Sequence, residues 1–425
     1  MNVAIIGAGW AGMAAAASLA QAKIRVTVFE AARRLGGRAR TLEIEGIALD
    51  NGQHILIGAY RETLRLMRAV GADPEQLLLR QPLAIEYPGK FSLRAPRLPA
   101  PLHLLAALLT ADGLAWGERI AAVRFMTAMR SKAYRITADM PVAELLAQHR
   151  QTGALARYLW EPLCVSALNT PAASASAQVF LNLLRDALDG ARANSDLLVP
   201  RADLGQLFPE PAAAFVRANG GSMHLGTQVR TLDKTADGFA LDANPERYSH
   251  VILAVGPHQL DALLEPFAAL APTRQSVAAL AYEPIYTCYL QYPPGVSMPQ
   301  SMTGFDGGSI QWIFDRGRLN GIPGLLAAVI SARGAHQNAS QDALASAIHA
   351  ELAAFLPGLP APLWSRVIAE KRATFSCRPD LARPANQTAI DRLYLAGDYT
   401  ANDYPATLES AVRSGVLAAR LVCQH

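Results

Sequence analysis

Residues 3–12 read Val-Ala-Ile-Ile-Gly-Ala-Gly-Trp-Ala-Gly, and this stretch decides the fold. Its β-branched start predicts a short buried strand, and the Ala-rich residues 13–22 predict a helix directly after the Gly-x-Gly-x-x-Gly pattern. In such a unit Gly7 makes the tight turn, Gly9 lets a pyrophosphate approach the backbone, and Gly12 lets the helix pack closely on the strand. The N-terminus of the helix then faces the phosphates. A Gly-rich turn with a purely structural role is the alternative.

A second strand is predicted over residues 24–29, and Glu30 ends it. This acid lies 18 residues past Gly12, where a βαβ unit of this kind bonds a ribose 2′-hydroxyl. A solvated charge at the end of a strand is the alternative. Because a carboxylate disfavours a 2′-phosphate, the sequence favours FAD or NAD over NADP.

The next residues separate these two cofactors. Residues 30–38 read Glu-Ala-Ala-Arg-Arg-Leu-Gly-Gly-Arg, which resembles the E-x-x-x-R-x-G-G-R extension of the flavin amine oxidase and phytoene desaturase superfamily. Gly36 and Gly37 expose backbone N–H groups toward phosphate, and Arg38 offsets the diphosphate charge. A basic surface loop is the alternative. The resemblance implies FAD as the cofactor and adds Arg34 to its site.

The far end of the chain resembles the C-terminal flavin motif of the same superfamily. Residues 392–400 predict a strand that runs into Gly397 and Asp398, and a helix is predicted from Ala406 onward. The resemblance implies that Asp398 bonds the ribityl or phosphate region. It also implies that the helix N-terminus points at the flavin N1–C2 carbonyl, where it stabilises anionic reduced flavin. A helix N-terminus that faces solvent is the alternative.

The middle of the chain suggests a discontinuous cofactor domain. Residues 220–232 predict a turn and a strand, and residues 250–255 predict another strand. The resemblance implies that Val229 meets the adenine; without it, this stretch is only a buried strand pair. The predicted cofactor domain covers 1–75, 200–265 and 385–425, and the predicted substrate-binding domain covers 76–199 and 266–384.

The two insertions differ in pattern. The first has apolar helical stretches at 102–109 and 120–129 with interleaved arginines, so its helical part, about 95–195, either docks at a membrane interface or packs with a solvated face. The second predicts antiparallel strands at 285–292, 308–314 and 325–330, followed by a helix at 341–356. The predicted fold class is therefore α/β. It combines a Rossmann-type FAD-binding domain with an inserted α+β domain that contains a mixed sheet and a helical subdomain.

Composition limits the class of protein. The 425 residues are 51% apolar and 17% charged, which supplies a large core and excludes a disordered chain. A net charge of +4 and a 7% aromatic share argue against nucleic-acid binding. No charged side chain occurs in residues 1–22, but their regular glycines argue against a membrane span or a signal segment. We therefore expect a soluble or peripherally bound protein.

The cysteines carry little chemistry. They are dispersed and form no Cys-x-x-Cys pair, so a zinc ribbon or a dithiol motif is disfavoured and no metal site is predicted. Dispersed thiols fit a reducing cytosol. The four positions are Cys164, Cys288, Cys377 and Cys423.

Three segments carry a narrower resemblance. Residues 50–61, 160–169 and 404–411 are similar to the hydroxysqualene dehydroxylases of bacterial squalene and hopanoid biosynthesis. The resemblance implies a reductive reaction in which hydroxysqualene loses its allylic hydroxyl and takes up a hydride from reduced FAD. It further implies a C30 isoprenoid lipid substrate, association with other enzymes of squalene and hopanoid biosynthesis, and a cytoplasmic location with peripheral contact to the inner face of the cytoplasmic membrane. One departure is Glu409-Ser410, where Glu-Gly is expected.

Such a reaction needs an acid near the leaving oxygen. His54 is the first candidate, because the Asp-x-Gly-x-His type segment reaches the flavin edge in this superfamily and an imidazolium donates at neutral pH. Its alternative role is a hydrogen bond to the flavin or the backbone. Glu161 is the second, because an apolar wall would raise its pKa; a buried ion pair with an arginine is its alternative. Asp403 and Tyr404 are weaker choices.

Two rival functions remain. A carotenoid desaturase or amine oxidase of the same superfamily would keep the fold and reverse the electron flow, although an amine oxidase commonly needs a lysine near the flavin and this chain has five lysines. A flavin-binding scaffold or lipid carrier without turnover is the second rival.

The residues predicted to bind the cofactor are Gly7, Gly9, Trp10, Ala11, Gly12, Glu30, Arg34, Gly36, Gly37, Arg38, Gly52, Gln53, His54, Val229, Gly397, Asp398, Ala406, Thr407 and Leu408.

Overall fold

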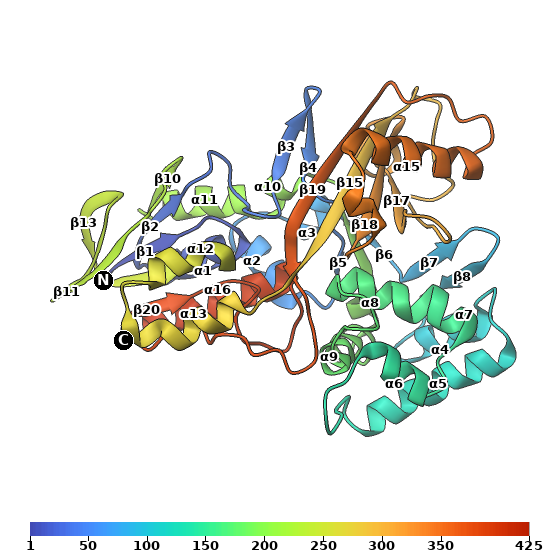
Figure 1. Ribbon diagram of the computed structural model, residues 1–425, viewed down its shortest axis with the longest axis horizontal. Helices are drawn as coiled ribbons and strands as arrows, with labels where there is room; N and C mark the ends of the chain where they lie inside the picture. Colours follow the sequence, from blue (N-terminus) through green and yellow to red (C-terminus); the bar gives the residue numbers. More distant parts are fainter. Residues whose placement is uncertain (425) are drawn as a thin grey trace.

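Five parallel strands form the sheet that the first βαβ unit begins. The computed structural model describes residues 1–424 and orders these strands β10-β2-β1-β14-β20, all parallel (Figure 1). Segments from both ends of the chain thus share one sheet, as the Rossmann-type prediction requires. The strands are β1 (Asn2–Ile6), β2 (Arg25–Glu30), β10 (Ser222–Leu225), β14 (His250–Leu253) and β20 (Leu393–Leu395).

Helix α1 (Trp10–Gln21) is clamped between this sheet and α16 (Leu408–Cys423). A Cβ on Gly12 would lie 1.9 Å from the carbonyl oxygen of Gly7, and a Cβ on Gly415 would lie 2.1 Å from that of Ala11. Both contacts therefore bring backbones closer than any other residue allows. The first contact gives Gly12 the packing role expected of it.

Further helices and a small sheet complete this half. The helices are α2 (Arg61–Ala69), α3 (Pro74–Leu77), α10 (Leu204–Leu207), α11 (Pro209–Ala218), α12 (Pro257–Leu264) and α13 (Ala271–Ala278). The antiparallel sheet is β11 (Leu232–Thr235), β12 (Gly238–Leu241) and β13 (Asn244–Tyr248). Helix α13 packs on α12.

The second half is built on a five-stranded sheet ordered β16-β17-β18-β15-β19. Every pairing in it is antiparallel, so the expectation of a mixed sheet is wrong here and the antiparallel reading of residues 285–330 is confirmed. Helices α14 (Arg316–Asn320) and α15 (Gln341–Phe355) belong to this half. The strands are β15 (Tyr282–Gln291), β16 (Met302–Gly304), β17 (Trp312–Asp315), β18 (Leu325–Ser331) and β19 (Trp364–Phe375).

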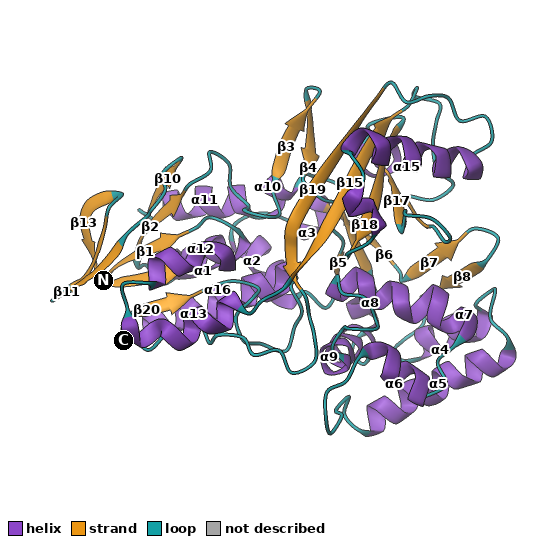
Figure 2. Ribbon diagram, viewed as in Figure 1, coloured by secondary structure: helices purple, strands orange, loops and turns teal. Residues whose placement is uncertain are grey.

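A helical part lies below this sheet in the view of Figure 2. It consists of α4 (Leu102–Thr110), α5 (Trp116–Ser131), α6 (Val142–Gln148), α7 (Gly153–Leu155), a π-helical turn (Ala156–Trp160), α8 (Glu161–Leu168) and α9 (Ala177–Leu188). The remaining pairings are antiparallel: β3 (Thr41–Ile44) with β4 (Ile47–Asp50), β7 (Ala84–Tyr87) with β8 (Phe91–Arg94), and β9 (Leu197–Pro200) with β5 (Leu56–Ile57) and β6 (Leu78–Gln81). Within residues 1–424, every helix is too short or too polar to cross a membrane.

The glycine contact between α1 and α16 gives a first prediction. We expect Gly415→Ala to lower the free energy of unfolding by about 1–3 kcal/mol, because the new methyl group meets a backbone oxygen that cannot move away cheaply. Denaturant unfolding followed by circular dichroism measures this. The matched control is Gly117→Ala in α5, where a Cβ meets nothing within 4 Å and no loss is expected. An unchanged midpoint for Gly415→Ala would show that α16 shifts without cost.

Candidate active site

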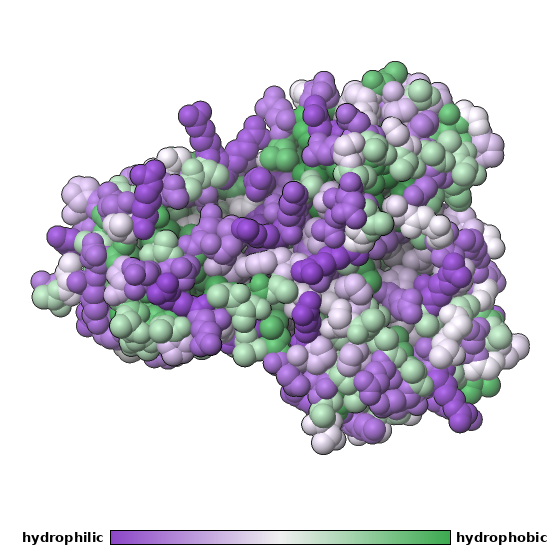
Figure 3. Space-filling view, in the orientation of Figure 1, coloured by the Kyte–Doolittle hydropathy of each residue, from purple (hydrophilic) through white to green (hydrophobic). Residues whose placement is uncertain are grey.

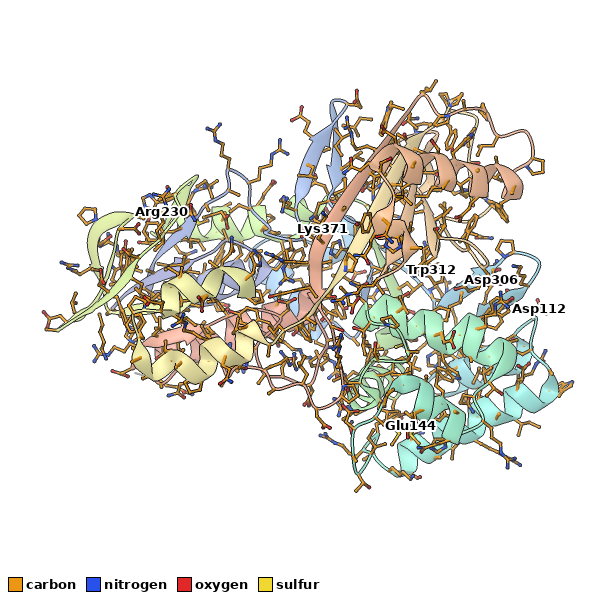
Figure 4. All side chains as sticks on the ribbon, in the orientation of Figure 1. Asp112, Glu144, Arg230, Asp306, Trp312 and Lys371 are labelled. Atoms are coloured by element: carbon orange, nitrogen blue, oxygen red, sulfur yellow. The ribbon has the colours of Figure 1, made fainter. Side chains whose placement is uncertain are left out.

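A cavity of about 1100 Å³ extends through both halves of the molecule. Arg230, beside the parallel sheet, and Trp312, on the antiparallel sheet, both line it and lie far apart in Figure 4. A pocket for one small ligand measures about 300–1,000 Å³. The cavity therefore has room for a dinucleotide at one end and a second molecule at the other.

Two glycine turns form the wall of the cavity at the nucleotide end. Gly7 takes φ +106°, which favours glycine, and the amide of Gly36 donates to the carbonyl of Ala8 at 3.0 Å. A Cβ on Gly9 would point toward the Cα of Gly37 at 3.8 Å. Side chains on these turns would fill the space that a pyrophosphate needs next to the backbone, so the cradle fits the group that the motif implies.

Glu30 is held at the carboxyl end of β2. Its Oε2 accepts from the amide of Ala8 at 2.7 Å, and its Oε1 accepts from the amide of Ala32 at 2.8 Å. The carboxylate thus ties the first glycine turn to the second strand, and it lines the cavity. Each oxygen keeps a further lone pair, so the position suits the ribose role that the spacing predicts.

Arg38 and Asp398 form an ion pair across the cavity wall. The guanidinium Nη2 lies 2.5 Å from Oδ1 of Asp398, 360 residues away, and Nη1 donates to the carbonyl of Ala373 at 2.8 Å. The Asp398 side chain is only 8% exposed. This pair locks the second glycine turn to the end of β20, so it fixes both predicted phosphate-binding segments with respect to each other.

The N-terminus of α16 faces the cavity rather than solvent. Ala406, Thr407 and Leu408 line the cavity, and the Thr407 hydroxyl caps the helix by accepting from the amide of Ser410 at 3.1 Å. The positive end of the helix dipole is therefore available to a developing negative charge. The expected helix begins at Leu408, two residues after the predicted start.

The segment at residues 52–54 is supported by an arginine that the sequence did not indicate. Arg316, 1% exposed, donates from Nη1 to Oε1 of Gln53 at 2.6 Å. Its Nη2 lies 3.9 Å from Oδ2 of Asp50, whose Oδ1 accepts from the amide of Leu204 at 2.8 Å. Burial raises the pKa of Asp50 to about 6, against the opposing effect of Arg316. Since Gln53 lines the cavity, Arg316 orients a cavity residue from behind.

His54 lines the cavity next to Gln53. Its Nδ1 lies 2.8 Å from the carbonyl oxygen of Gly52. Because a carbonyl only accepts, Nδ1 carries the proton in the neutral ring and Nε2 keeps a lone pair. Burial lowers the pKa of His54 from its ordinary value of 6.5, so the imidazolium prevails only in acid. The backbone bond matches the alternative role weighed above, and the catalytic role stays a prediction.

Glu161 does not occupy the expected place. Its side chain is exposed, and it does not line the cavity, although Trp160 and Pro162 on either side do. Helical neighbours lie about 100° to either side of a residue, so two neighbours that reach the cavity leave the residue between them free to face outward. The expectation of a buried carboxyl in an apolar wall is therefore wrong.

The end of the cavity away from the glycines is apolar. Representative lining residues are Ile85, Leu93, Leu159, Leu184, Phe314 and Val329. Polar groups missed from the sequence include Ser166, whose hydroxyl accepts from the indole Nε1 of Trp312 at 3.1 Å, and Tyr60, whose pKa is raised by burial. The sequence does not indicate such residues, because a single polar side chain in an apolar segment is recognisable as part of a site only when the neighbouring elements are known.

The predicted cofactor residues mostly lie around this cavity. Gly12 is the exception, because it packs α1 on the sheet. Val229 lines the cavity from a loop after β10, which ends earlier than the expected strand. The lining residues are Gly7, Gly9, Trp10, Ala11, Glu30, Arg34, Gly36, Gly37, Arg38, Gly52, Gln53, His54, Val229, Gly397, Asp398, Ala406, Thr407 and Leu408.

Lysines are missing from the cavity wall formed by residues 1–424. Lys371, on β19, is exposed and labelled in Figure 4, and Lys90 pairs with Asp306 at 3.1 Å on the surface. The wall formed by these residues therefore offers no lysine of the kind that an amine oxidase commonly places near its flavin.

Glu30 gives a second prediction. We expect Glu30→Ala to weaken cofactor retention on the order of 10- to 100-fold, since a carboxylate that accepts hydrogen bonds contributes about 1.5–3 kcal/mol. The ratio of flavin to protein absorbance after gentle desalting measures this. Glu75→Ala is the control, because Glu75 pairs with Arg68 at the surface and its side chain is 59% exposed. Equal flavin occupancy in both variants would contradict the ribose assignment.

The sequence of this chain is similar to those of known proteins. Residues 10–423 match the family described as flavin containing amine oxidoreductase. Hydroxysqualene dehydroxylase of Rhodopseudomonas palustris is 30% identical over 99% of this chain and 98% of its own. The protein of the same name from Sinorhizobium fredii is 27% identical over 99% and 98%. Zeta-carotene desaturase of Solanum lycopersicum is 22% identical over 100% of this chain and 81% of its own.

The fold is also found among solved structures. Putrescine oxidase with bound putrescine superposes with a TM-score of 0.71 at 19% identity, covering 100% of both chains. The expectations of a flavin amine oxidase fold and of FAD as the cofactor are thereby confirmed. The chain belongs to the flavin-containing amine oxidoreductase family and is an FAD-dependent oxidoreductase that is similar over nearly its whole length to the hydroxysqualene dehydroxylases.

Proposed function

We propose that this protein catalyses the reductive dehydroxylation of hydroxysqualene to squalene. The observation that carries the proposal is the continuous cavity, which starts at the cofactor motifs, passes His54 and ends in an apolar chamber. The similarity to two hydroxysqualene dehydroxylases over nearly the whole chain supports the same substrate. The apolar side chains of the chamber suit a C30 isoprenoid better than a cationic amine.

The reaction sets three demands on the protein. The allylic C–O bond breaks, the hydroxyl leaves as water after it takes up a proton, and a hydride takes its place on carbon. Reduced FAD, when bound, supplies the hydride. The protein must therefore provide a proton at the leaving oxygen, hold the allylic carbon in position and exclude stray water that would trap a cation.

The apolar chamber supports the last two of these roles. Its wall is made of large aliphatic and aromatic side chains from the helical part and the antiparallel sheet, such as Leu159, Leu184 and Phe314. Ser166, held by the Trp312 indole at 3.1 Å, is a polar group in this wall that suits contact with a substrate hydroxyl. Such a wall orients a polyene by shape and leaves few groups that would retain water.

His54 is the candidate proton donor at the edge between chamber and cofactor site. Its Nδ1 is engaged by the Gly52 carbonyl, so the proton that it transfers must come from Nε2 of the imidazolium. Burial lowers the pKa of His54, so this form gains population as the pH falls below 6.5. A reaction that uses His54 as the acid therefore speeds up toward low pH.

An anaerobic single turnover tests the function. The protein is reduced with dithionite, freed of excess reductant and mixed with hydroxysqualene in detergent micelles, while the flavin spectrum and the extracted lipid are followed. We expect reoxidation of the flavin with an equal amount of squalene formed. An unreacted lipid, together with bleaching of the oxidised flavin by a polyene or an amine, would assign the protein to desaturation or amine oxidation instead.

The role of His54 is tested by His54→Gln. We expect this variant to retain FAD and to lose on the order of 100-fold or more in turnover, the typical contribution of a general acid. In the unsubstituted protein turnover should rise as the pH falls through the lowered pKa, and His54→Gln should lose this slope. His349→Gln is the control, since His349 lies on α15 bonded to Tyr292, away from the cavity. Normal turnover in His54→Gln would remove His54 from the catalytic groups.

A further inference from the structure

Exposed apolar side chains gather on one part of the helical region. The described residues include nine large apolar side chains that are exposed, and six of them fall within 98–120. We call this surface the α4–α5 face. Its members are Leu98 at 42% exposure, Leu102 at 52%, Leu105 at 38%, Leu109 at 37%, Trp116 at 66% and Ile120 at 47%. In Figure 3 green and pale residues are visible over this region at the lower right.

Helix α4 is apolar on both sides. Its sequence contains no charged residue, and Leu104 and Leu108 line the cavity while Leu105 and Leu109 are exposed. A surface helix normally turns polar residues outward. Here a single helix separates the substrate chamber from the outside, and neither of its faces is polar.

The surroundings of this face are strongly basic. Residues 94–135 contain seven arginines and lysines and two acidic residues, a net charge of +5, whereas the whole chain carries +4. Arg94 pairs with Glu86 and Arg130 with Asp189. Arg97 and Arg124 form no ion pair within residues 1–424, so their charge is available to a partner. Spacing of four residues places Arg124 on the same side of α5 as Trp116 and Ile120.

One arginine also stiffens the edge of the face. The Arg119 guanidinium lies 4.8 Å from the centre of the Trp116 ring, donates from Nη2 to the carbonyl of Ala111 at 2.8 Å and from Nε to that of Leu114 at 3.3 Å, and also contacts the carbonyl of Leu109. These bonds hold the turn between α4 and α5 and keep the indole at the surface. A rigid, amphipathic indole next to cations is suited to the boundary between lipid headgroups and acyl chains.

We propose that the α4–α5 face docks on a bilayer that contains anionic phospholipids, and that a lipid substrate passes between bilayer and chamber along α4. The exposed leucines and Trp116 enter the boundary of the acyl chains, and Arg97 and Arg124 meet lipid phosphates. The passage of substrate rests on the proposed function, whereas the docking does not. Apolar residues on both sides of α4 then give a C30 chain a continuous apolar path.

Vesicle flotation tests the docking with holoprotein and no substrate. We expect flotation with vesicles of phosphatidylcholine and phosphatidylglycerol, and on the order of tenfold weaker binding for the double variant Leu105→Ser/Trp116→Ser. Arg97→Gln/Arg124→Gln should lose binding to the anionic vesicles only, and added salt should have the same effect. Leu363→Ser is the control, since Leu363 is 68% exposed before β19 and lies outside the face. Flavin content and thermal midpoint must match in all variants.

Two results would overturn the docking: absence of flotation for the unsubstituted protein, or equal flotation of Leu105→Ser/Trp116→Ser. A change in oligomeric state of that variant by sedimentation velocity, with flotation unaltered, would assign the face to a second copy of the chain.

A turnover assay tests the passage of substrate between bilayer and chamber. We expect Leu105→Ser/Trp116→Ser to turn over hydroxysqualene from micelles normally and from vesicles slowly; equal rates from vesicles would overturn it. Failure of the micelle reaction in the unsubstituted protein would reject the proposed function and leave the docking result standing.

Discussion

Backbone contact at glycine is the constraint on which the architecture depends. Helix α1 touches the turn after β1 at Gly12 and α16 at Gly415, and at each point a Cβ would lie about 2 Å from a carbonyl oxygen. These contacts hold the first and last helices of the chain together over one parallel sheet. The N-terminus of α1 and the N-terminus of α16 can then both face one cavity, which the intervening residues complete from the other side.

Electrostatics reinforces this arrangement across the chain. Arg38 and Asp398 close an ion pair between positions 360 residues apart, and the pair is largely shielded from water on the carboxylate side. Shielding from water strengthens the attraction, and it obliges both groups to stay paired. The cavity is therefore bounded by an ion pair near the glycine turns, whereas apolar side chains shape the chamber at its other end.

The sequence predicted those parts of the site whose chemistry is local. Glycine turns, strand-end acids and helix starts depend on spacing within a few residues, so Gly7, Glu30 and Thr407 could be placed together in advance, and all three line the cavity. Arg316 could not, because its bond to Gln53 joins positions 263 residues apart. The expectation for Glu161 was wrong for a related reason. Its neighbours Trp160 and Pro162 reach the cavity, but Glu161 lies on the opposite, exposed side of the helix. The expectation of a mixed sheet was wrong, although the alternating pattern within residues 285–330 already favoured antiparallel strands, as the structure has them.

A buried carboxylate resolves a conflict that this packing creates. Helices α2 and α16 bring their N-termini close together, and two positive dipole ends repel each other. Glu409 lies between them, fully buried, and accepts from the amides of Glu62 at 3.1 Å and Thr63 at 2.9 Å, while Arg413 Nε lies 2.7 Å away. Its charge satisfies α2 and is itself compensated, so the positive end of α16 remains available to the cavity. Ser410 stands where a glycine is expected, and its hydroxyl donates to the Asp398 carbonyl at 3.2 Å. That bond draws the capped end of α16 toward β20, and so the departure from the family pattern adds a contact at the point where helix, strand and cofactor site meet.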